Sequence, residues 1–86
     1  MDSYEIYNII PKDGRIKSVH GVILGRRCWI ADVRVGKRGL LMVDVDDSDI
    51  GPHRIKLSAL LRVVGMPGDP KVQIKTENTV YILRKI

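Results

Sequence analysis

The clearest structural signal in this chain is the alternating stretch Lys71-Val-Gln-Ile-Lys-Thr-Glu-Asn-Thr-Val-Tyr-Ile-Leu-Arg-Lys85. From Val72 to Ile82 every second residue is apolar or a small polar residue that strands accept, and this period of two is typical of a sheet with one buried face. The unbroken alternation favours one long bent strand over a hairpin that turns at Glu77 and Asn78. In either arrangement the stretch predicts a sheet.

Regular glycine and proline breaks in the rest of the chain also indicate strands. Glycine or proline occurs about every 8–12 residues, which is typical of a small all-β domain. Further strands are expected over residues 4–10, 15–24, 28–35, 40–45 and 54–64. Residues 55–64 also match a helical stripe, but ten residues between glycine and proline make a marginal helix, so a strand is preferred. The prediction is an all-β fold, a small antiparallel barrel or rolled sheet of about six strands.

Length and composition narrow the class of protein. The 86 residues allow a single β domain over residues 1–86, and an apolar fraction of 44% argues against wholesale disorder. Cys28 is the only cysteine, so no disulfide can form within the chain. No apolar run approaches the roughly 20 residues of a membrane span, and the N-terminus does not resemble a signal peptide. We therefore expect a soluble cytoplasmic domain that does not act at a membrane.

Residues 15–45 are expected to form a central three-stranded meander. Tight turns at Gly25–Arg27 and Lys37–Gly39 would connect its strands. If the last strand slipped by one residue against its neighbour, Asp44 would be buried. The register that keeps Asp44 on the outer face is therefore preferred. That register places these residues on the core face: Val19, Gly21, Ile23, Trp29, Ala31, Val33, Val35, Leu41, Val43 and Val45.

The same register places His20, Asp32 and Asp44 in one row on the outer face, with Arg34 one step along. One imidazole and two carboxylates resemble a divalent-metal site. A charge-compensated surface group explains them with fewer assumptions, because only one imidazole is available and Arg34 can offset a carboxylate. The metal stays an open alternative, and no cofactor is expected.

The acidic stretch over residues 44–49 does not fit a calcium-binding loop. Such a loop needs glycine at its sixth position and glutamate at its twelfth, where this chain has Asp49 and Ile55. A solvated loop is the simpler interpretation.

Catalytic arrangements are not evident. Cys28 lies near Arg26 and Arg27, which would favour its thiolate, but the expected register brings no histidine beside it. His53 has no identifiable partner, and no glycine motif of a nucleotide site is present. A buried, inert cysteine is preferred, and the chain is not expected to be an enzyme or to bind a small-molecule substrate.

Charge supplies the main functional signal. Without residues 44–49, which carry four of the ten acidic side chains, fifteen cations face six carboxylates, for a net charge of +9. The turns of the meander bring six cations toward one end of the sheet: Lys12, Arg15, Lys17, Arg34, Lys37 and Arg38.

This basic end predicts a nucleic-acid-binding protein. The chain has no phenylalanine, Trp29 is expected in the core, and Tyr4 and Tyr7 lie on opposite faces of their strand. Phosphate contacts to duplex DNA or structured RNA, with weak sequence specificity, are therefore favoured over recognition of single-stranded bases. The alternative is an interaction module that self-associates, or binds a partner, through a free edge at its first or last strand.

Overall fold

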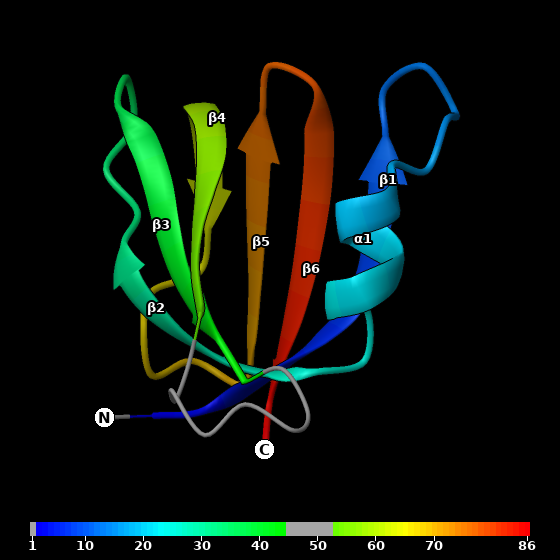
Figure 1. Cartoon of the computed structure of the whole chain (residues 1–86). Helices are drawn as coiled ribbons and strands as arrows, with labels where there is room; N and C mark the ends of the chain where they lie inside the picture. Colours follow the sequence, from blue (N-terminus) through cyan, green and yellow to red (C-terminus); the bar gives the residue numbers. More distant parts are fainter. Residues whose placement is uncertain (1, 45–52) are drawn as a thin grey trace.

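The computed structural model describes residues 2–44 and 53–86. In this part of the chain six antiparallel strands close into a small barrel, and one short helix lies beside it (Figure 1). The elements are β1 (Tyr4–Pro11), α1 (Ser18–Ile23), β2 (Arg27–Asp32), β3 (Arg38–Val43), β4 (His53–Val64), β5 (Lys71–Thr76) and β6 (Thr79–Lys85). The predicted all-β barrel of six strands is confirmed.

The two ends of the chain close the barrel. β1 pairs with β6 along its whole length, from Tyr4 opposite Lys85 to Pro11 opposite Thr79. The expectation of a free edge at the first or last strand is therefore wrong. Each of these strands uses the other to satisfy backbone groups that an open sheet would leave unpaired.

β5 and β6 form a hairpin, so the preference for one long strand is also wrong. The Thr76 hydroxyl holds the turn, because it donates to the Thr79 carbonyl at 2.9 Å and accepts from the Thr79 amide at 3.0 Å. Both threonines point into the barrel, so the inward face changes parity at the turn. Val80 and Ile82, which the alternation assigned to the same face as Val72, lie on the outside instead.

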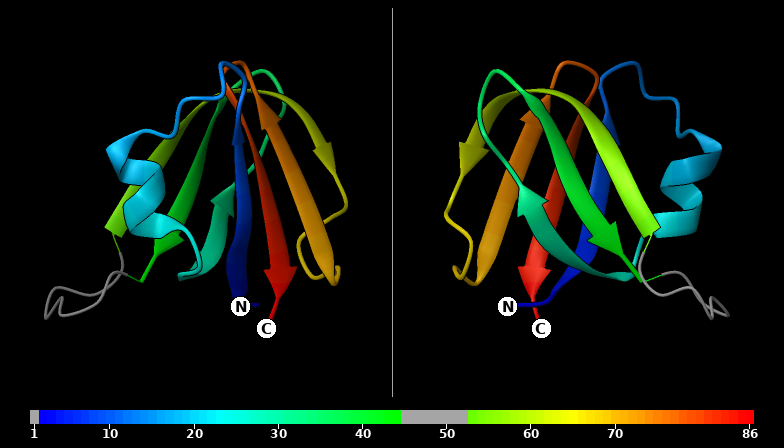
Figure 2. Two further views of the ribbon diagram at one scale, coloured as in Figure 1. Left: turned by 90° about the vertical axis from the view of Figure 1, so that its right-hand side faces the viewer. Right: turned by 60° about the vertical axis from the view of Figure 1, so that its left-hand side comes forward.

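The segment expected as the first strand of the meander contains α1. β1 pairs with β2 at only two positions, Tyr4 with Cys28 and Glu5 with Arg27, and the two strands then diverge. His20 and Ile23, one helical turn apart, are buried at this seam. The β-branched composition of residues 15–24 favours a strand only weakly, and burial against the barrel overrides that preference. Figure 2 shows α1 lying along the flank of the barrel beside β1.

The predicted meander register is half right. Leu41 and Val43 are buried as expected, but they pair with Ile30 and Cys28, so Trp29 lies on the other face. Val35 and Ala31 are exposed, and Val45 is outside the described residues.

The position of the turn explains this error. The turn closes from Arg34 to Lys37, with Gly36 at φ +86°, instead of over Lys37–Gly39. Ala31 is left without a partner in a β-bulge, which shifts the register further. Gly39 is buried, and a Cβ there would lie 2.6 Å from a Leu60 methyl carbon.

β4 is a strand, as preferred, and it turns the corner of the barrel. Its first half pairs with β3 and its second half with β5, with a bulge at Leu61 where it changes partner. Figure 2 shows it arching over one end. The interior is filled by one cluster of buried side chains: Tyr4, Ile6, Ile9, Ile23, Cys28, Leu41, Val43, Leu57, Leu60, Val72, Ile74, Tyr81 and Leu83.

Two glycines with positive φ provide a test of the fold. Gly65, after β4, has φ +93°, and a Cβ there would lie 2.7 Å from the Lys71 carbonyl oxygen. Gly36 has a similar φ, but a Cβ there meets nothing within 4 Å. We expect Gly36→Ala to lower the free energy of unfolding by about 1–2 kcal/mol through backbone strain alone. Gly65→Ala should cost clearly more in the same urea titration, and equal losses would contradict the close contact.

Candidate nucleic-acid interface

The six cations singled out in the sequence all lie on loops or strand ends at one end of the barrel. This is the upper end in Figure 1, where the β1–α1 connection, the β2–β3 loop and the β5–β6 turn are found. We call it the loop end. Asp44 and His53, which flank the acidic stretch, lie at the opposite end of β3 and β4. The stretch over residues 45–52, with its predicted solvated loop, lies outside the described residues.

Three of the six cations surround one hollow. Lys12, Arg15 and Lys17, all in the β1–α1 connection, line a depression of about 370 Å³ together with Asp13 and Asn78. Asp13 uses one carboxylate oxygen to accept from the Arg15 amide at 2.9 Å. Within the described residues none of the three cations forms an ion pair, so their charges face solvent.

The other three cations lie in the β2–β3 loop and at the start of β3, and they do not line this hollow. Arg34 makes a bidentate pair with Asp32, at 3.0 and 2.9 Å, which partly neutralises it. Arg38 donates from Nε to the Leu57 carbonyl oxygen at 3.0 Å, so its side chain also positions β4. Lys37 has no ion pair among the described residues. The loop end therefore carries two basic groups. Among the described residues all three cations of the first group lack an ion pair, and Lys37 is the cation of the second group whose side chain makes neither an ion pair nor a hydrogen bond.

Backbone hydrogen bonds connect the two groups in sequence. The Leu60 amide donates to the Lys37 carbonyl, the Glu77 amide to the Ala59 carbonyl, and the Lys12 amide to the Asn78 carbonyl. The Asn78 side chain also donates to the Ser58 hydroxyl at 2.9 Å. The middle of β4 and the β5–β6 turn thus lie between the two groups and hold both on one rigid support.

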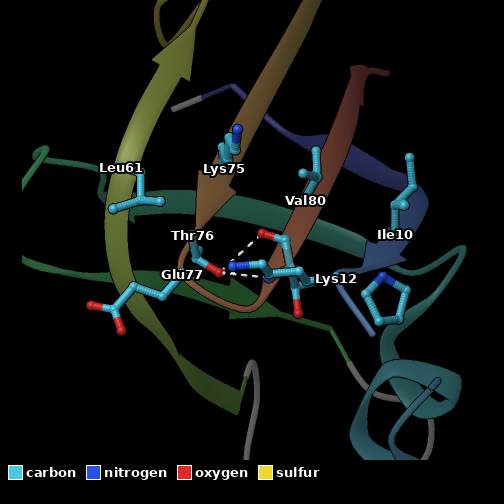
Figure 3. A pocket seen from close by; sticks show the side chains of 9 residues that line it. Ile10, Lys12, Leu61, Lys75, Thr76, Glu77 and Val80 are labelled. Atoms are coloured by element: carbon cyan, nitrogen blue, oxygen red, sulfur yellow. Dashed lines mark hydrogen bonds between the residues drawn. The ribbon is translucent and has the colours of Figure 1, made fainter. Parts of the chain in front are cut away.

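A second hollow opens on the outer face of the sheet next to the loop end. It encloses about 380 Å³, and Ile10, Val80 and Leu61 supply its apolar walls. Figure 3 shows these three side chains with Lys12 and Lys75 around the groove. Within the described residues neither lysine pairs with Glu77, the one carboxylate that lines it. The sequence alone did not place Lys75, because its position depends on how the strands after residue 45 pair.

The row of His20, Asp32 and Asp44 does not exist. His20 is buried on α1 with Nε2 3.5 Å from the Tyr81 hydroxyl, Asp32 pairs with Arg34, and Asp44 follows β3 at the far end. The expected row assumed that α1 was a strand. Among the described residues no three His, Cys, Asp or Glu side chains come together as a metal site.

The surroundings of Asp32 and Cys28 alter the pKa values of these side chains. Hydrogen bonds from Arg34 hold the pKa of Asp32 below its usual value. Burial raises the pKa of the Cys28 thiol to about 12. The thiol is therefore neutral near pH 7, in agreement with the buried, inert cysteine expected from the sequence.

No family model, curated protein or solved structure matches this chain. In the described residues no helix has the length and apolar character needed to cross a membrane.

His20 should make stability depend on pH. Its Nδ1 accepts from the Lys17 amide at 3.4 Å, which requires the neutral ring. Burial, and then the charge of Lys17, lower its pKa in the folded state. The unfolded chain therefore takes up the proton more readily, and stability present above pH 6.5 is lost as the pH falls below that value. Thermal melts at pH 7.5 and 5.5 should show a smaller pH-dependent loss for His20→Asn, which keeps an acceptor but does not titrate.

Cys28 should be unreactive in the folded protein. At pH 8 a thiol with this pKa and no solvent exposure presents almost no thiolate to an aromatic disulfide reagent. We expect complete reaction within minutes in urea and negligible reaction over the same time in buffer. Fast labelling of the native protein would contradict the inward position of Cys28 on β2.

Proposed function

We propose that this barrel is a non-catalytic nucleic-acid-binding protein that contacts phosphates with the cations of its loop end. One observation carries the proposal: Lys12, Arg15 and Lys17 surround a single hollow, and among the described residues neither these three cations nor Lys37 on the same end forms an ion pair. Clustered cations that are not neutralised attract a polyanion and release its counterions on binding.

The arrangement also supports weak sequence specificity. The loop-end cations lie on connections of different lengths instead of on one helix or ribbon that could follow a groove and read base edges. Phosphate contacts position a protein on duplex DNA or structured RNA without reading its sequence. A blunt duplex is therefore the appropriate first probe.

The experiment is fluorescence anisotropy of a labelled 30-base-pair duplex at several salt concentrations. We expect log affinity to fall linearly with log salt. The double variant Arg15→Glu with Lys37→Glu should reduce this slope by about two and weaken binding by about tenfold or more, since two attractions become repulsions.

The matched control is Arg54→Glu with Lys56→Glu, which makes the same change in net charge. Both residues are exposed on β4, toward the end that carries His53. This control should keep most of the affinity. Equal losses from the two double variants would refute the loop end as the binding surface, and no binding at low salt would refute the proposed function.

A further inference from the structure

Two β-bulges turn large apolar side chains onto the same outer face of the barrel. Ile6 pairs with Leu83 and Asn8 with Ile82, so Tyr7 is the extra residue of β1 and is 55% exposed. In β4, Leu61 is the extra residue between two pairs and is 53% exposed. Bulges of this kind redirect side chains, often beside functional sites. Between these two bulges lie β6 and β5.

The face between the bulges carries apolar and cationic side chains next to one another. The ladder places Ile10 beside Val80, Val80 beside Lys75, and Lys75 beside Arg62. Toward the end of the barrel where the two termini lie, Lys71 pairs with Arg84. We call this surface of β1, β6, β5 and the second half of β4 the β6 face.

Tyr7 is held in place by its neighbour on β6. The Arg84 guanidinium carbon lies 4.5 Å from the centre of the Tyr7 ring, and Glu5 accepts from Arg84 at 2.8 Å. Tyr7, Arg84 and Lys71 line a hollow of about 360 Å³ with Ile82 as its floor. The groove between Ile10, Val80 and Leu61 lies about 7 Å along β6 from this hollow, since Val80 and Ile82 are two strand residues apart.

We propose that the β6 face binds an unpaired nucleic-acid strand, with a base stacked on Tyr7 and phosphates held by Lys75 and Lys71. This inference rests on the proposed function and names a single strand as the preferred substrate of the surface that adjoins the loop end. Lys12 connects the two surfaces, because it lines both the loop-end hollow and the groove on the β6 face.

The chemistry of the face favours a single strand over the other polyanions. In a duplex the bases are stacked away from such a surface, so Tyr7, Ile10 and Leu61 would gain nothing from it. An unpaired strand offers both flat bases and phosphates, which the apolar and the cationic side chains of this face can contact.

The experiment compares binding of labelled dT12 and of the blunt duplex to the intact protein and to three variants. Tyr7→Ala should weaken dT12 binding by about tenfold, the usual effect of removing one stacking platform. Tyr7→Phe should retain affinity within about twofold, because stacking does not need the hydroxyl. Met66→Ala, which removes another exposed apolar side chain in the β4–β5 connection, should change neither probe.

The outcomes separate this inference from the proposed function. It is overturned if Tyr7→Ala leaves dT12 binding unchanged or weakens duplex binding equally, even where the loop-end reversals still weaken the duplex. It is also overturned if the protein binds phosphatidylserine vesicles but not dT12. Binding to dT12 that depends on Tyr7, with no binding to the duplex, would support the β6 face and refute the loop end.

Discussion

Closure of the barrel by β1 and β6 is the constraint on which the rest of the structure depends. Strand edges carry backbone donors and acceptors that are costly to leave unpaired when buried, and this chain joins its two ends to satisfy them. The other edge of β1 pairs with β2 at only two positions. The seam that remains is filled by His20 and Ile23 from α1, so the one helix of the described residues follows from the closure.

Closing so few short strands also requires sharp local bends, and bulges provide them. β4 changes partner at Leu61, and β1 bends at Tyr7. Each bulge leaves one residue without a cross-strand partner, and that residue faces solvent. The features that shape the barrel therefore also put apolar side chains on its β6 face, where Lys75 and Arg84 lie beside them.

The loop-end cations lie far from Asp44 along the axis of the barrel. Lys12, Arg15 and Lys17 occupy the loop end, while Asp44 begins the acidic stretch from the other end of β3. Within the described residues Arg34, beside Asp32, is the one loop-end cation that forms an ion pair. The β5–β6 turn joins the loop end to the β6 face through Lys12 and Asn78, so a bound polyanion would meet one continuous surface.

Fold class follows from the amino-acid pattern alone, because period-two alternation and regular glycine and proline breaks permit little besides a small antiparallel barrel. Three features do not follow from it: which loop-end cations lack an ion pair among the described residues, the parity change at Thr76, and the helix over Ser18–Ile23. Alternation continues unchanged through a tight turn, so it cannot show that Val80 and Ile82 face outward. Tertiary structure decided these features, since a bulge or a turn shifts the register by one residue, and each such shift exchanges the inner and outer faces of a strand.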